Sequence, residues 1–127
     1  MKNGQIFHVN FNGCIGQEIN KVHLAIIFKL PNLKNLFLCI PLTSPKLKHF
    51  KTEKDFVNRN YRNIKHINWQ YINQTDSIAL LDQIKTISKS RLLKEYRDKN
   101  NESITLNDKN KKIIIDKLFK YMKLIFK

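Results

Sequence analysis

The sequence has 127 residues, of which 42% are hydrophobic, so it is long enough to form one packed core and is not typical of a disordered chain. Its 24 Lys and Arg outnumber its 10 Asp and Glu, and the net charge of +14 favours a polyanionic partner such as RNA, DNA or an anionic membrane surface. The two cysteines have neither CxxC spacing nor a paired histidine cluster, which excludes a tetrahedral zinc site and indicates reduced thiols.

No secretory or membrane-spanning segment is predicted. The N-terminus has no apolar signal segment and passes directly into a strand pattern. The longest uncharged apolar stretch near the middle, residues 24–28, is far shorter than the roughly 20 residues that cross a bilayer. No linker or repeat divides the chain, so we expect a single cytoplasmic domain over residues 1–127.

Three strands are predicted in the first third of the chain. Residues 5–11 alternate apolar and polar side chains, which is typical of a half-buried strand, and residues 12–21 read as an exposed loop. Residues 22–30 and 36–41 are apolar and rich in β-branched side chains, as expected of more fully buried strands. Short connections between these strands favour an antiparallel sheet that curls into a barrel.

The middle of the chain is strongly basic and then returns to strand patterns. Thr52 followed by acidic residues predicts the start of a short helix. Residues 67–72 and 77–87 resume apolar strand patterns, separated by a polar turn. Residues 90–96 are interpreted as a second short helix.

A C-terminal helix is predicted from Asn107 onward, where the hydrophobic period becomes 3.6 and Asn107 or Asp108 can cap the start. The helix packs on the sheet, completes a dimer interface or lies on an anionic membrane, and the first two readings are the more usual ones. The predicted fold class is α+β, with about five strands followed by this helix. Four residues define its apolar face: Ile114, Leu118, Met122 and Ile125.

Two segments carry the functional signal. The first covers residues 16–27, Gly-Gln-Glu-Ile-Asn-Lys-Val-His-Leu-Ala-Ile-Ile, and leads through the next strand to Pro41-Leu42-Thr43-Ser44. The second covers residues 77–92, Ser-Ile-Ala-Leu-Leu-Asp-Gln-Ile-Lys-Thr-Ile-Ser-Lys-Ser-Arg-Leu. In this order and spacing they resemble the MazF/PemK family of toxin ribonucleases, and residues 41–46 also resemble the related ToxN-type RNases.

The resemblance covers residues 4–93 and is weakest over residues 48–68. It implies an SH3-like small antiparallel β-barrel of the MazF/CcdB type with a short middle helix and a C-terminal helix. It also implies a homodimer that cuts single-stranded RNA without a metal or other cofactor, and a cognate antitoxin protein that holds the toxin inactive.

Metal-free RNA cleavage uses the 2′-OH as the nucleophile and leaves a 2′,3′-cyclic phosphate and a 5′-OH. It needs a base for the 2′-OH proton, an acid for the leaving oxygen and donors to the charged phosphorane. In the family, the Arg of an Arg-Pro pair and the Thr of Pro-x-Thr-Ser form the site. Thr43 matches that Thr, and Ser44 beside it is a second donor to a phosphate oxygen.

The sequence departs from the family where His23-Leu24 stands in place of Arg-Pro. Arginine is a permanent cation with a bidentate phosphate fork, whereas histidine ordinarily titrates near neutral pH and serves as an acid or base. His23 therefore either keeps activity with altered chemistry or marks a weakened enzyme. Lys21 and Lys46 are the candidates to supply the lost fixed charge.

The remaining candidates support the site or bind RNA. Glu18 orients an active-site base or is a plain loop carboxylate, and Gln83 is interpreted as a buried amide in a strand beneath the site. For Asp82 and Lys85, a surface position is as consistent with the sequence as a role at the site. The other three histidines, His8, His49 and His66, carry no motif and are read as non-catalytic. The basic middle segment either binds RNA or is a solvated loop. If it binds RNA, Tyr61 and Trp69 can stack on unpaired bases. The candidates for contact with the RNA backbone in this segment are Lys46, Lys48, Arg59 and Arg62.

Three functional hypotheses follow. The first is a sequence-selective, metal-independent endoribonuclease toxin with His23 and Thr43 at its site. The second is a catalytically weakened or inactive module of the same barrel that binds RNA or the antitoxin. The third is a toxin of the same shape that acts on a protein, as the gyrase-poisoning relatives of this barrel do, and that leaves RNA intact.

Overall fold

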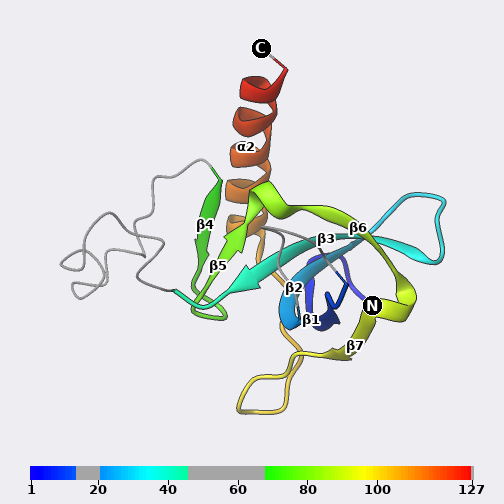
Figure 1. The fold of residues 1–127 in the computed structure, drawn as a ribbon. Helices are drawn as coiled ribbons and strands as arrows, with labels where there is room; N and C mark the ends of the chain where they lie inside the picture. Colours follow the sequence, from blue (N-terminus) through cyan, green and yellow to red (C-terminus); the bar gives the residue numbers. More distant parts are fainter. Residues whose placement is uncertain (14–20, 46–67, 127) are drawn as a thin grey trace.

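The computed structural model describes residues 1–13, 21–45 and 68–126, and Figure 1 shows their arrangement. They form antiparallel strands, two short 3-10 helices and one long C-terminal helix, which confirms the α+β class. In chain order the elements are β1 (Gln5–Asn10), β2 (Val22–Lys29), β3 (Leu36–Thr43), β4 (Trp69–Ile72), β5 (Ser77–Leu80), η3 (Leu81–Gln83), β6 (Lys85–Ser88), η4 (Lys89–Arg91), β7 (Leu92–Glu95) and α2 (Asp108–Ile125).

The sheet is open rather than a closed barrel. Its strand order is β4-β5-β3-β2-β1-β7, and β6 pairs with β3 beside this path. One edge of β3 is shared, because its first half pairs with β6 while Leu42 and Thr43 pair with β5. The closed barrel expected from the sequence is therefore not found in the described residues, since no ladder there joins β4 to β7.

Both faces of the sheet carry a hydrophobic core. Ile6 pairs with Ile26 and Ile26 with Ile40, so these three side chains form a row on one face. The neighbouring positions point to the other face, where Val9 and Cys39 belong to a second buried cluster. Burial on both sides explains why β2 and β3 are almost continuously apolar instead of alternating.

Helix α2 covers the first of these faces. Asn107 caps it by accepting a hydrogen bond from the Asn110 backbone N–H at 2.8 Å, as the sequence predicted. Ile114 is 2% exposed in the core, and the Lys117 ammonium donates to the Trp69 carbonyl at 2.6 Å. Burial, with a smaller effect from Lys120, lowers the pKa of Lys117.

The apolar face of α2 is only partly buried. Met122 and Ile125 were expected on the packed face, but they are 49% and 57% exposed. Figure 1 shows the reason, because the C-terminal half of the helix extends past the strands that its first turns cover. Within the described residues, no helix is long and apolar enough to span a membrane.

Two predictions for the second half of the chain were wrong. The single strand expected over residues 77–87 is two strands, β5 and β6, with the 3-10 turn η3 between them. The helix expected over residues 90–96 is the turn η4 followed by strand β7. Pairing of β7 with β1 and packing of Leu92 on the core outweigh local propensity there. The short helix expected from Thr52 lies outside the described residues.

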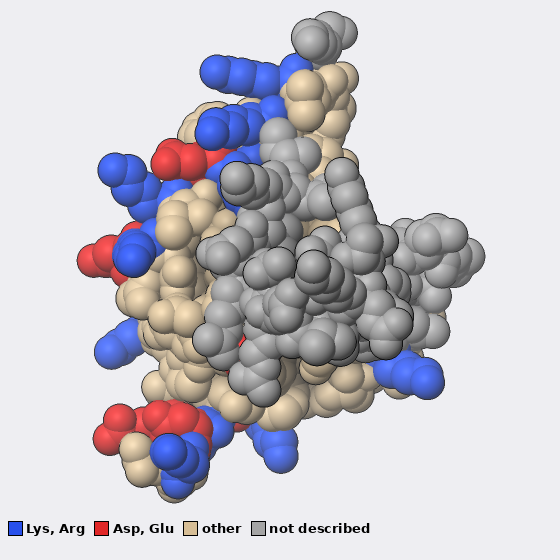
Figure 2. All heavy atoms as spheres, turned by 90° about the vertical axis from the view of Figure 1, so that its left-hand side faces the viewer, with Lys and Arg blue, Asp and Glu red and all other residues tan. Residues whose placement is uncertain are grey.

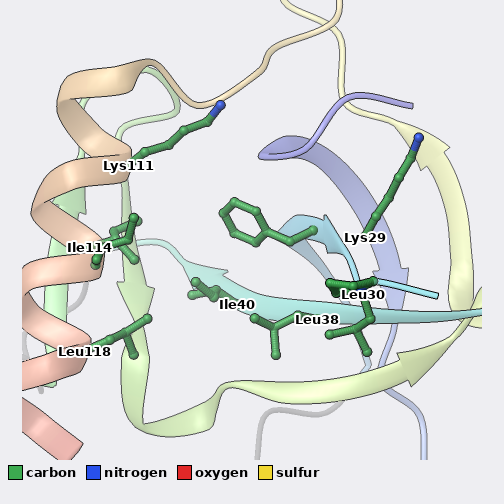
Figure 3. Close-up of a pocket in the computed structure, with 10 residues that line it drawn as sticks. Lys29, Leu30, Leu38, Ile40, Lys111, Ile114 and Leu118 are labelled. Carbon is green, nitrogen blue, oxygen red and sulfur yellow. The ribbon is translucent and has the colours of Figure 1, made fainter. Parts of the chain in front are cut away.

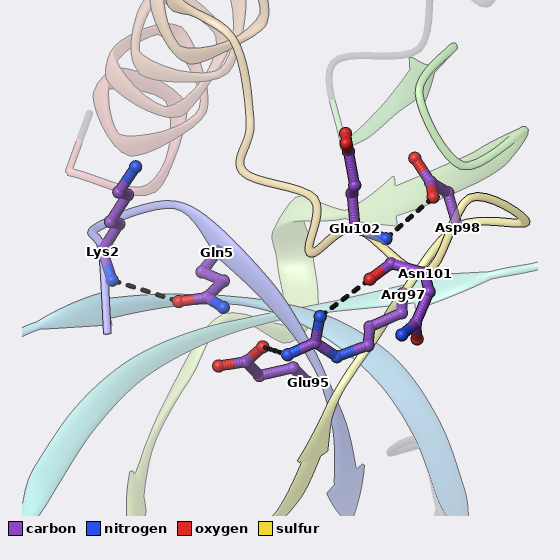
Figure 4. Close-up of polar contacts among 7 residues, drawn as sticks. All are labelled: Lys2, Gln5, Glu95, Arg97, Asp98, Asn101 and Glu102. Carbon is purple, nitrogen blue, oxygen red and sulfur yellow. Dashed lines mark hydrogen bonds and ion pairs between the residues drawn. The ribbon is translucent and has the colours of Figure 1, made fainter.

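A compact turn leads from β7 back to the sheet and α2 (Figure 4). Arg97 pairs with Glu95 at 3.0 Å and donates to the Asn101 carbonyl at 2.8 Å. Asp98 accepts a hydrogen bond from the Glu102 N–H at 3.0 Å. The chain then runs beside the start of β1, where the backbone N–H of Ile6 donates to the Ile104 carbonyl at 3.0 Å. The start of α2 is thereby held against the sheet.

The contact of α2 with the sheet predicts that substitution by Ala lowers the free energy of unfolding by different amounts at two adjacent isoleucines. Ile114→Ala removes a fully buried side chain and should lower the free energy of unfolding by about 2–5 kcal/mol. Ile115 is 51% exposed, so Ile115→Ala should change it by no more than about 0.5 kcal/mol. Urea unfolding followed by circular dichroism measures both, and equal effects would contradict the described packing of α2.

Candidate functional site

The two predicted catalytic residues lie at the same end of neighbouring strands. Ala25 on β2 pairs with Pro41 on β3, and this is the last pair of their ladder. His23 stands two residues before Ala25, and Thr43 stands two residues after Pro41. Because side chains two residues apart in a strand share a face, His23 and Thr43 lie on one face of the sheet, the face opposite α2.

Thr43 is held by the branching of the sheet at the end of β3. It pairs with Ile78 on β5, and its side chain is 8% exposed. Ser44 follows it outside the strand and is exposed. The position thus offers a hydroxyl on a well-paired strand next to an accessible one, in keeping with two donors to a phosphate oxygen.

His23 contacts an aromatic side chain at the end of β1. Its ring centroid lies 6.4 Å from that of Phe11, with the ring planes tilted by 58°. Phe11 is fully buried, and its backbone N–H donates to the Lys21 carbonyl at 2.8 Å. His23 itself is half-buried, so its imidazole is packed on one side and partly accessible on the other.

Lys85, for which the sequence left a surface position open, is half-buried and contacts the same ring. Lys85 opens β6, and its ammonium lies 5.6 Å from the centroid of Phe11, a distance at which a cation interacts with an aromatic face. Phe11, His23 and Lys85 are called the Phe11 cluster from here on. Strand alternation back from buried Ile87 places Lys85 on the core face, but alternation alone does not show that Phe11 of another strand meets it there.

An arginine clamps the turn that carries Phe11. Arg91 donates from one guanidinium nitrogen to the carbonyls of Asn10 and Asn12, both at 2.9 Å. The Asn12 N–H also donates to the Asn10 side chain at 2.9 Å. Because Phe11 lies between these two residues, Arg91 holds the backbone on either side of the residue whose ring His23 and Lys85 contact. The basic residue near the end of the second motif therefore anchors this turn.

The remaining residues named from the sequence lie on a turn, in a 3-10 helix, on the other face of the sheet or outside the described residues. Lys21 is exposed on the turn into β2 with a left-handed φ of 69°. Gln83 lies in the turn η3 and is half-buried, so its expected place in a strand was wrong. His8 points to the opposite face of β1 beside the Tyr96 ring, where burial and then Lys94 lower its pKa. Six predicted RNA-binding or supporting residues fall outside the described part of the chain: Glu18, Lys46, Lys48, Arg59, Tyr61 and Arg62.

On the face that Figure 2 shows, the charged side chains of the described residues are spread rather than gathered. Figure 2 shows Lys and Arg side chains around the described part of one face, including along α2, with a few acids between them. Over residues 1–13, 21–45 and 68–126, no group of three or more His, Cys, Asp or Glu could hold a metal ion. The positive field therefore favours a polyanion over a broad surface.

A pocket of about 340 Å³ lies away from the Phe11 cluster, between α2 and strands β2 and β3 (Figure 3). Leu38 and Ile40 line it from the sheet, and Ile114 and Leu118 line it from the helix. This is the opposite face of the sheet from His23 and Thr43. Its lining is mainly apolar, which suits side-chain packing, and Lys29 and Lys111 are the charged residues among those that line it.

Residues 2–112 match the family described as PemK-like, MazF-like toxin of type II toxin–antitoxin system. No curated protein matches the sequence. A match over this much of the chain shows that the protein belongs to this toxin family, which confirms the resemblance seen in the sequence. Membership implies a toxin role and an antitoxin as partner.

Burial makes the thiol of Cys39 unreactive. Cys39 lies on the same face of the sheet as His23 and Thr43. Cys39 is fully buried and pairs with Lys85, and desolvation raises the pKa of its thiol to about 12 although Lys85 acts in the opposite direction. At pH 8 only about one thiol in 10,000 would be ionised. In a Cys14→Ser variant we expect negligible reaction with a thiol reagent at pH 8 until guanidinium unfolds the chain. Rapid reaction of the native protein would contradict the described burial.

Proposed function

We propose that this member of the toxin family is a metal-independent endoribonuclease that cuts single-stranded RNA, with His23 and Thr43 as catalytic residues. The observation that carries the proposal is the position of these two residues at one end and on one face of β2 and β3. One is a potential acid or base, and the other is a hydroxyl donor on a rigid strand.

The reaction is an internal transfer at phosphorus. The 2′-oxygen attacks the adjacent phosphate, and the P–O5′ bond breaks, which leaves a 2′,3′-cyclic phosphate and a 5′-OH. His23 accepts the proton of the 2′-OH as the new P–O bond forms. The departing 5′-oxygen takes a proton from water, so charge and atoms balance without a metal or cofactor.

Thr43 stabilises the charge that develops on the phosphorane. Its hydroxyl and Ser44 donate to a non-bridging oxygen, where a fixed donor is most effective because it need not reorient during the reaction. Pairing of Thr43 with Ile78 holds the backbone in place. The Phe11 ring limits the freedom of the His23 imidazole in the same way.

RNA is proposed to cross the basic surface of a homodimer. Its backbone would contact Lys21, Ser44, Lys46, Lys48, Arg59 and Arg62, with Glu18 and Gln83 supporting the site. The net charge of +14 supports a polyanionic substrate and an acidic antitoxin segment. The pairing of one edge of β3 with β6 and then with β5 supports a single toxin domain of the SH3-like small-barrel type, because one strand is shared by two parts of the sheet.

One observation favours a second candidate function. His23-Leu24 stands where the family has Arg-Pro, so the permanent cation of that position is missing. A chain without that charge could retain the surface that binds RNA or the antitoxin and have lost cleavage. In that case RNA would be bound and left intact.

Cleavage of a long single-stranded RNA in EDTA tests the proposal. The wild-type protein should give discrete fragments with 5′-OH ends, and Thr43→Ala and His23→Ala should each slow cleavage by about 100-fold or more. Sequencing gels of end-labelled RNA measure the rates and the cut sites.

Two matched variants serve as controls. His8→Ala removes a histidine from the other face of the sheet, and Thr86→Ala removes an exposed threonine from β6. Both should cut RNA at close to the wild-type rate. RNA that is bound by the wild-type protein and remains intact would refute the enzyme and favour the binding module.

A further inference from the structure

We propose that Lys85 binds a non-bridging oxygen of the scissile phosphate and supplies the permanent positive charge that a histidine at position 23 does not carry. This inference rests on the proposed ribonuclease function. It assigns Lys85, rather than Lys21 or Lys46, as the residue that compensates for the missing arginine of the family.

The Phe11 cluster brings Lys85 and His23 to the same aromatic ring. The Lys85 ammonium lies 5.6 Å from the centroid of Phe11, and the His23 ring lies 6.4 Å from the same centroid. Both side chains therefore have this buried ring as a common neighbour, on the face of the sheet that carries Thr43. The Phe11 ring also steers the lysine, because an ammonium above an aromatic face is attracted to it.

Lys85 and Thr43 are joined by the same strand. Lys85 pairs with Cys39 on β3, and Thr43 stands four residues farther along that strand. Four residues of strand span about 13 Å between Cα atoms. A lysine side chain from one end, a threonine hydroxyl from the other and a phosphate between them fit this spacing. Both anchors are paired strand positions, which hold a site more firmly than loops do.

The surroundings of Lys85 strengthen its effect on an anion. It is half-buried beside the fully buried Phe11 and Cys39, where the local dielectric is lower than in water. Its charge already acts on this face, because it opposes the rise in the pKa of the Cys39 thiol. Lys21, in contrast, is exposed on a turn, where solvent screens its charge.

Neutral and charged substitutions at position 85 separate charge from packing. Lys85→Met keeps an unbranched stem against Phe11 and removes the charge, and Lys85→Gln removes the charge with a polar end. Lys85→Arg keeps a permanent cation. We expect both neutral variants to slow single-turnover cleavage at saturating RNA by about 100-fold, and Lys85→Arg to stay within about fivefold of wild type.

The matched control is Lys99→Met, which removes one exposed positive charge from the turn before α2. It should cut at close to the wild-type rate, and circular dichroism melts should show all four variants folded. Cleavage by Lys85→Met and Lys85→Gln at the rate of Lys99→Met would overturn the assignment while the ribonuclease itself stood. Failure of the wild-type protein to cut RNA would instead refute the proposed function.

Discussion

The pairing of β3 along both edges is the constraint on which the rest of the structure depends. β2 lies along one edge, while β6 and then β5 share the other. This arrangement brings His23, Thr43 and Lys85 from three strands to one face of the sheet. It also leaves the opposite face to α2, so the core that α2 covers and the candidate site lie on different sides of the same strands, and the site adjoins the second buried cluster.

The elements that could be predicted were those with a strong local signal. Alternation or continuous apolar runs predicted β1, β2 and β3, and the Asn107 cap predicted the start of α2. The turn η3 and strand β7 were missed because they are set by pairing with distant strands, β3 and β1, rather than by local propensity. Exposure of Met122 and Ile125 was missed because helical periodicity carries no information on where the sheet ends.

For the site, the family motifs pointed to Thr43 and His23, and the register of β2 and β3 places both at one end of the strands. The part played by Phe11 and Lys85 could not be read from the sequence, because it depends on side chains that meet across β1, β2 and β6. Arg91 belongs to the second motif, but only the structure shows that it donates hydrogen bonds to the turn around Phe11. The family motifs thus pointed to the candidate site, and strand pairing identified the neighbours of its residues.

The central claim is that RNA is cut by attack of its own 2′-oxygen at the face formed by His23 and Thr43. The most direct measurement uses a short RNA containing one cut site, with a single 2′-deoxy nucleotide on the 5′ side of the scissile bond. In EDTA, the wild-type protein should cut the all-RNA strand and leave the substituted strand intact, because the nucleophile has been removed. Cleavage of the substituted strand at the same bond would contradict the account.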